Sequence, residues 1–168
     1  MLLYTTLFRS PWTGAYENNH VPEIERQIRV LKERTRACSH SLPFTHPPRL
    51  ILIDMMHNAA LWVNVFPPKG GVSTISPRSL TTGIKFDYAK HCQLSFGSYA
   101  QVHEENQPTN NQQPRTIGTI FLGPTGNLQG GYKFYNLTTG KLITRRKWTA
   151  LPMPMEVIAR VNRIGQAQ

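Results

Sequence analysis

A segment rich in proline and glycine, residues 67 to 77, divides this sequence into two parts with different periodicities. Before the segment, apolar residues recur at the three- and four-residue spacing of helices. After it, short runs of strand-forming residues alternate with turn sequences. Because the two periods cannot belong to one element, we expect an α+β protein in which a helical layer, residues 22 to 66, precedes a small antiparallel β unit.

Residues 22 to 37 form the first predicted helix. Pro22 suits a first turn because its missing N–H needs no partner there, and Glu23 and Glu25 favour the positive end of the helix dipole. The helix must end before Pro43. One narrow arc lacks charge and is expected to face the core: Ile24, Ile28, Leu31, Thr35 and Cys38.

The other arc of this helix carries Glu25, followed by Arg29, Lys32 and Arg36 at i+4, i+7 and i+11. An ordinary solvated helix also has a mixed-charge face, and the pattern alone favours that interpretation. Three bases aligned behind one acid instead indicate a ridge that follows a phosphate backbone. Both interpretations stay open on the pattern alone.

Residues 49 to 66 are apolar almost all round and predict a second helix packed on the first. Asp54, His57 and Asn58 interrupt the apolar run and argue against a transmembrane span. A lone histidine on such a helix is usually a hydrogen-bonded core residue. We therefore interpret His57 as structural.

Beyond a connector at residues 67 to 92, four runs read as strands: 93 to 103, 116 to 122, 132 to 137 and 142 to 148. Segments 124 to 127 and 138 to 141 are expected to be hairpin turns in which glycine supplies a positive φ. Sequential short strands predict a small barrel over residues 93 to 150. Residues 151 to 168 would then form a short helix or a spacer.

The formal charge of +10 arises from a scarcity of acids, of which there are only nine. This balance favours a nucleic-acid partner over an acidic metabolite, and no basic amphipathic helix suited to a membrane surface is present in the sequence. The barrel region adds candidate contacts to nucleic acid: Lys133, Arg145, Arg146 and Lys147. Four aromatic residues interleave with these bases and could stack on nucleobases, although alternation along strands puts most of them in the core: Tyr132, Phe134, Tyr135 and Trp148.

Two cysteines, Cys38 and Cys92, are too few for a disulfide scaffold and lack the spacing of a zinc site. They favour an intracellular, reducing compartment. The first nine residues lack the basic start and long apolar run of a signal peptide. We expect neither secretion nor a membrane anchor.

Several stretches together resemble the integrase portion of copia-type LTR retrotransposon polyproteins. The first helix is similar to that family's E-R-x-x-R-x-x-x-E-K-x-R run, which opens with the last carboxylate of the D,D,E triad. Glu25 occupies that position because Arg26 follows it directly. Residues 52 to 67 resemble the next helix of an RNase H-like core, and residues 93 to 150 resemble the Src-homology-3-like barrel that follows it.

The resemblance implies a role in DNA integration. In such integrases three carboxylates hold two divalent cations, Mg²⁺ or Mn²⁺, for phosphoryl transfer. Glu25 would be a catalytic residue and metal ligand, while Arg29 and Lys32 would contact the ends of the element's DNA. The implied partners are DNA, with RNA as an alternative, and other integrase subunits. The implied location is the nucleus or a virus-like particle.

The chain also departs from the family. Only 24 residues precede Glu25 and none of them is aspartate, so the other two carboxylates are missing. We therefore expect a polyprotein fragment, with residues 1 to 21 as an N-terminal remnant and loop, that holds no metal stably and lacks strand-transfer activity by itself. The alternative is a non-enzymatic small-barrel module that binds nucleic acid or protein in particle assembly.

Overall fold

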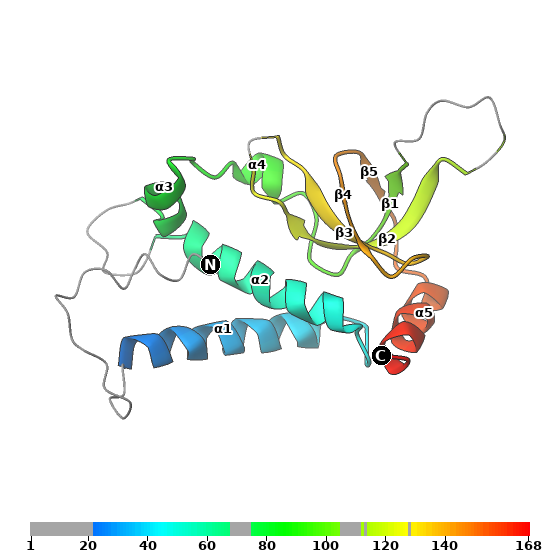
Figure 1. Ribbon diagram of the computed structural model, residues 1–168, viewed down its shortest axis with the longest axis horizontal. Coiled ribbons are helices and arrows are strands. Elements are labelled where there is room, and N and C mark those ends of the chain that lie inside the picture. The colour runs from blue at the N-terminus through cyan, green and yellow to red at the C-terminus, as the bar shows by residue number, and fades with distance from the viewer. Residues whose placement is uncertain (1–21, 68–74, 105–111, 113, 128) are drawn as a thin grey trace.

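The computed structural model describes residues 22–67, 75–104, 112, 114–127 and 129–168 (Figure 1). The predicted N-terminal remnant at residues 1 to 21 lies outside this part of the chain. The described elements, in chain order, are α1 (Pro22–Ser41), α2 (Arg49–Val65), α3 (Pro77–Thr82), α4 (Tyr88–His91), β1 (Tyr99–His103), β2 (Thr116–Pro124), β3 (Tyr132–Asn136), β4 (Leu142–Arg145), β5 (Trp148–Ala150) and α5 (Met155–Gln166). The predicted α+β class is confirmed.

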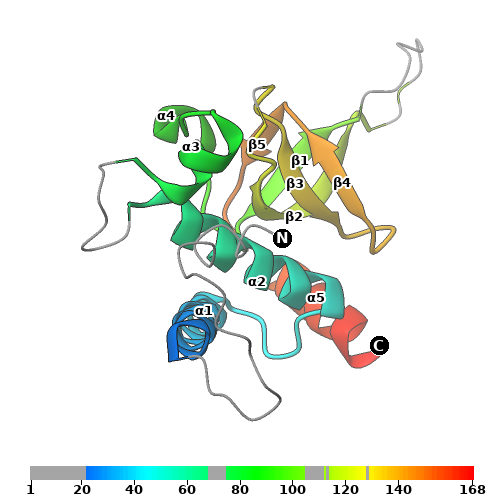
Figure 2. The same ribbon diagram turned by 60° about the vertical axis from the view of Figure 1, so that its left-hand side comes forward.

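α1 is the outermost layer of the molecule, since α2 lies between it and the sheet in both views (Figures 1 and 2). It ends at Ser41, which is before Pro43 as predicted but beyond the predicted range of residues 22 to 37. The prediction that its uncharged arc is core was wrong. No residue of α1 is buried, and Ile24 and Ile28 keep 38% and 45% of their surface exposed. The arc stays half-exposed because α2 covers α1 from one side only.

α2 buries one face although its sequence is apolar almost all round. Ile51, Met55 and Val65 are at most 1% exposed, whereas Met56 is 61% exposed. The placement of His57 in the core was also wrong, because its side chain is 68% exposed on the open face. No helix among the described residues is long and apolar enough to cross a bilayer.

The five strands form one antiparallel sheet in the order β4-β3-β2-β1-β5. The run predicted as one strand at 142 to 148 is split into β4 and β5, which lie at opposite edges of the sheet. The predicted small barrel is therefore wrong for the described residues, whose sheet is not closed. β4 and β5 are only four and three residues long, and each pairs with a single neighbour. They do not pair with each other, so the two edges of the sheet stay apart.

The two predicted hairpin turns are present, and a bulge that was not predicted bends the sheet. Gly126 and Gly140 have φ of +69° and +67° in the two predicted hairpin turns. β2 and β3 change register between Phe121 and Gly123, and such a bulge increases the local bend of the sheet.

Alternation along the strands produces two hydrophobic clusters. The first lies where the sheet meets α2 and α5 and consists of Phe44, Ile51, Ile120, Leu122, Tyr135, Leu137 and Val161. The second consists of Ala100, Val102, Phe121, Tyr132 and Phe134. Consecutive residues of one strand, such as Phe134 and Tyr135, belong to different clusters. The sheet therefore contributes side chains to both clusters.

α5 joins the helical layer to the sheet. Val161 is fully buried in the first cluster. The Arg160 Nε donates to the Leu137 carbonyl at 2.8 Å, and the His46 amide donates to the Asn162 Oδ1 at 3.0 Å. The C-terminal segment is thus a packed helix and not a spacer.

Gly165 allows this close approach of α5. A Cβ at Gly165 would lie 1.9 Å from the His46 carbonyl oxygen, which is backbone. Replacing glycine by alanine inside a helix normally stabilises by about 1 kcal/mol. Here we expect Gly165→Ala to lower the free energy of unfolding by about 1–3 kcal/mol, because α5 must move off the loop. Urea unfolding followed by tryptophan fluorescence measures the change.

The control is Ala159→Gly at an exposed position of the same helix. It should lower the free energy of unfolding by about 1 kcal/mol through helix propensity alone. If Gly165→Ala stabilises the protein, α5 is not seated against His46 in solution.

Candidate nucleic-acid interface

The structure places Glu25, Arg29, Lys32 and Arg36 on one exposed side of α1. α1 is continuous through all four, so the 3.6-residue period lines them up. The three bases span about 10 Å of helix axis at 1.5 Å per residue. Successive phosphates of one duplex strand rise 3.4 Å along the duplex axis, so a length of about 10 Å corresponds to about three such steps. We call Arg29, Lys32 and Arg36 the α1 ridge.

Glu25 does not belong to a metal centre in the part of the chain that the structure describes. No group of three His, Cys, Asp or Glu side chains lies close enough together there to hold a metal ion. Asp54 lies on α2 with its carboxylate toward Lys133. The described residues therefore do not supply the three carboxylates of the two-metal site that the resemblance implies.

Lys133 stabilises the fold through an ion pair and is only partly exposed at the surface. Its Nζ lies 3.5 Å from the Asp54 Oδ1, so that β3 is tied to α2 by an ion pair. The Asp54 side chain is 9% exposed and the Lys133 side chain 35% exposed. The His57 Nδ1 lies 3.7 Å from the same carboxylate oxygen. A lysine that is paired with a buried carboxylate attracts a phosphate more weakly than an unpaired lysine does.

The other three predicted bases of the sheet lie together at the turn from β4 to β5. The Arg145 Nη1 donates to the Thr144 carbonyl at 2.9 Å, and the Arg146 Nη2 donates to the Gln129 Oε1 at 2.9 Å. Arg146 and Lys147 are exposed. Together with Arg145 they form a second, smaller basic surface. The sequence shows that these three bases are neighbours, but it does not show which way their side chains point.

Three of the four aromatic candidates of the sheet are not available for stacking on bases, and the fourth, Trp148, is partly buried with its ring centroid 5.9 Å from that of Tyr132. Tyr132, Phe134 and Tyr135 are 4%, 0% and 0% exposed. Burial raises the pKa of the Tyr132 and Tyr135 hydroxyls, and for Tyr132 the Asp87 carboxylate raises it further. The alternation along β3 therefore places these side chains in the core, as the pattern predicts. Stacking on nucleobases would need other residues.

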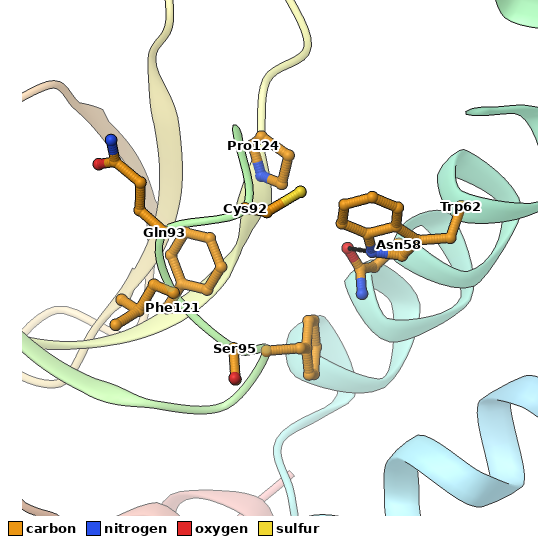
Figure 3. A pocket seen from close by; sticks show the side chains of 9 residues that line it. Asn58, Trp62, Cys92, Gln93, Ser95, Phe121 and Pro124 are labelled. Carbon is orange, nitrogen blue, oxygen red and sulfur yellow. Dashed lines mark hydrogen bonds between the residues drawn. The ribbon is translucent and has the colours of Figure 1, made fainter. Parts of the chain in front are cut away.

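A cavity of about 380 Å³ separates α2 from the segment that leads into β1. Figure 3 shows Trp62 and Asn58 projecting from α2 on one side, with Cys92 and Phe121 opposite. The Trp62 Nε1 donates to the Asn58 Oδ1 at 3.2 Å. Burial, followed by the nearby Asp87 carboxylate, raises the pKa of the Cys92 thiol, so it stays protonated at neutral pH. This cavity does not supply a thiolate nucleophile.

The connector predicted at 67 to 92 contains two short helices, α3 and α4, that sequence reasoning missed. Phe86 fastens it to α2 through an edge contact with Trp62, with ring centroids 5.7 Å apart. The two caps that start these helices are readable in the sequence: Ser76 accepts from the Ser79 amide, and Asp87 accepts from the Lys90 amide. Helices of six and four residues are too short to show a period.

The Asp54–Lys133 pair can be tested by a double-mutant cycle. We expect Asp54→Asn and Lys133→Gln each to destabilise the fold, and the double variant to lose less than the sum by about 0.5–1 kcal/mol, the value of a partly exposed pair. Chemical denaturation of all four proteins gives the coupling. Asp54→Asn with Arg146→Gln is the control cycle and should be additive. A coupling near zero in the first cycle would mean that the pair does not form in solution.

Comparisons with models of protein families, with curated proteins and with solved structures found no match to this chain. They neither support nor oppose the integrase resemblance. The functional assignment therefore depends on the residues and on where the fold puts them.

Proposed function

We propose that this chain is a nucleic-acid-binding piece of a copia-type retrotransposon integrase and contributes to DNA integration by binding DNA. The observation that carries the proposal is the exposed α1 ridge on the outermost layer of a protein with a formal charge of +10. Arg29, Lys32 and Arg36 can reach a phosphate backbone without any change in the fold.

The binding would be electrostatic. Nucleic acid carries condensed counterions, and each phosphate neutralised by a lysine or arginine releases part of them to bulk solvent. The net charge steers the encounter over longer distances. Arginine adds geometric preference because its planar guanidinium can donate two parallel hydrogen bonds to one phosphate. The α1 ridge then fixes orientation on the backbone and reads no base sequence.

The finer fold assignment is part of the same proposal. α1 and α2 would be C-terminal helices of an RNase H-like core, and the sheet would be of the Src-homology-3-like kind. Support comes from the order of elements, two helices followed by a β meander, and from β5, which returns to pair with β1. A meander whose last strand returns to its first curls toward a barrel even though its edges stay apart.

Charge removal on the α1 ridge tests the proposal. Changing Arg29, Lys32 and Arg36 together to glutamine should weaken binding to duplex DNA and lower the slope of log affinity against log salt by about two to three, close to one unit per phosphate contact. Fluorescence anisotropy at several salt concentrations measures both.

A matched variant removes three charges elsewhere: Arg49, Lys141 and Arg163, all exposed and outside α1. It should reduce affinity slightly through net charge and leave the slope nearly unchanged. Equal effects of the two triple variants would show that α1 is ordinary solvated surface.

Catalysis is expected to be absent from the isolated chain. One carboxylate cannot hold two divalent cations against their mutual repulsion, so purified protein with Mg²⁺ or Mn²⁺ should not process a duplex that carries the element's end sequence. A gel assay for shortened or joined strands measures this, with an active integrase as the positive control. Any metal-dependent product that disappears with Glu25→Gln would contradict the expectation.

A further inference from the structure

We propose that the cavity between α2 and the segment leading into β1 binds one unpaired nucleobase of a single-stranded nucleic acid. This base site rests on the proposed function, since it adds base contacts to the phosphate contacts of the α1 ridge. Pockets for small ligands measure about 300–1,000 Å³. At about 380 Å³ the cavity is at the small end of that range, which suits one base better than a larger ligand. Solvent reaches it, because three of its lining residues are exposed: Cys92, Gln93 and Ser95.

The described residues that line this cavity carry no charge. Three aromatic side chains are among them, Trp62, Phe96 and Phe121. Figure 3 shows the Trp62 ring between α2 and the segment that carries Cys92. A phosphate would meet no cation among these side chains, whereas a neutral, planar base can lie against an aromatic ring. The base is therefore the part of a nucleic acid that fits the cavity, and the sugar–phosphate backbone stays outside.

Asn58 supplies a hydrogen-bond donor for the base. Its Oδ1 accepts from the Trp62 Nε1 at 3.2 Å, and because an indole N–H can only donate, the amide cannot be turned the other way round. The Asn58 Nδ2 is thus left as a donor, and no described residue accepts from it. Nucleobases carry ring nitrogens and carbonyl oxygens that accept such a bond. An apolar side chain of a protein partner would cover this donor without offering an acceptor, so a base fits better.

A row of aromatic rings continues from the cavity wall to the surface. The ring centroids of Trp62 and Phe66 are 6.1 Å apart and those of Phe66 and Tyr88 are 6.0 Å apart, with the planes inclined by 26° in both pairs. Nearly parallel rings at this separation are offset, so each covers only part of its neighbour's face. Phe66 and Tyr88 are 48% and 45% exposed. The next bases of the same strand can stack on these two rings, whatever their sequence.

The charge beside this row suits a polyanion. Lys85 directly precedes Phe86, whose ring makes edge contacts with Trp62 and Tyr88 at centroid distances of 5.7 and 5.5 Å. The Lys85 side chain is exposed and pairs with no described residue. Asp87 is an acid nearby, and its carboxylate caps the start of α4. The formal charge of +10 attracts a nucleic acid, Lys85 can contact one of its phosphates, and the uncharged rings hold its bases.

The experiment separates bases from charge. The full chain is titrated with two labelled single-stranded oligonucleotides of equal length and equal phosphate number, one intact and one in which abasic sugars replace the central nucleosides. Fluorescence anisotropy gives both affinities. We expect the intact strand to bind at least about fivefold more tightly, the low end of what one base stacked on an aromatic ring contributes.

The two cysteines report where the bases lie. At saturating concentrations of each strand, the Cys92 thiol should react with a maleimide more slowly under the intact strand than under the abasic one, because Cys92 lines the cavity. Cys38 lies in α1 and should react at the same rate under both strands. Mass spectrometry of the peptides distinguishes the two thiols.

Variants locate the effect. Cys92→Leu with Ser95→Leu adds bulk to the cavity at two exposed positions and should remove the preference for the intact strand while leaving the affinity for the abasic strand unchanged. Thr139→Leu with Thr149→Leu places the same side chains at two exposed positions outside the cavity and should keep the preference. Trp62→Leu should also remove it. Because the Trp62 ring contacts Phe86, a misfolded Trp62→Leu protein is set aside and the exposed positions decide.

A preference for the intact strand that the cavity variant removes and the control variant keeps supports the base site. The site is overturned if the two strands bind equally, or if both double variants lower the preference alike. If the α1 ridge variant weakens both strands in that case, the proposed function stands while the base site fails. A cavity-dependent preference together with an α1 ridge variant that changes neither affinity would support the base site and contradict the role proposed for α1.

Discussion

The contact of α2 and α5 with one side of the sheet is the interaction on which the rest of the structure depends. Ile51 and Val161, both fully buried, meet Ile120 and Tyr135 there. A five-stranded open sheet with short edge strands is marginal unless a face is covered. The residues that follow α5 also cap α2, because Pro48 offers no side-chain cap and the Arg49 amide instead donates to the Gln168 Oε1 at 3.0 Å. Without α5, both the sheet and the start of α2 would lose a partner.

Two consequences follow for the other elements. α1 packs on α2 and not on the sheet, so its position depends on the sheet only through α2. The connector is held by a different kind of contact, the aromatic rings of Trp62, Phe86 and Tyr88, with neighbouring centroids 5.5 to 5.7 Å apart. Aromatic pairs of this geometry contribute about 0.5–1.5 kcal/mol beyond area burial. α1 and the connector are therefore attached to α2 through separate contacts.

Features that depend on neighbours along the chain were predictable from the sequence. The helix before Pro43, the glycines of both hairpin turns and the helix at the C-terminus follow from prolines and periodicity. Features that depend on contacts between distant parts of the chain were not predictable. His57 and Ile28 look like core residues by pattern and are exposed because only one side of each helix is covered. The pairing of Asp54 with Lys133 joins residues 79 positions apart, and no local signal indicates it. The same holds for Arg78, Lys85 and Lys90, which the fold alone gathers at one cavity.

The basic residues differ in how readily they can bind a phosphate, and the difference has a physical reason. A cation near a buried carboxylate, such as Lys133, has already lost hydration and gained a partner, so a phosphate must compete with Asp54 for it. A cation on an outer helix keeps its hydration and gives up only counterions when nucleic acid arrives. The aromatic residues that could have made the sheet a binding face are buried in its clusters. The basic residues that the core does not need lie on the outer side of α1 and at the turn from β4 to β5, and these can change in charge with little effect on the packing of α5 against the sheet.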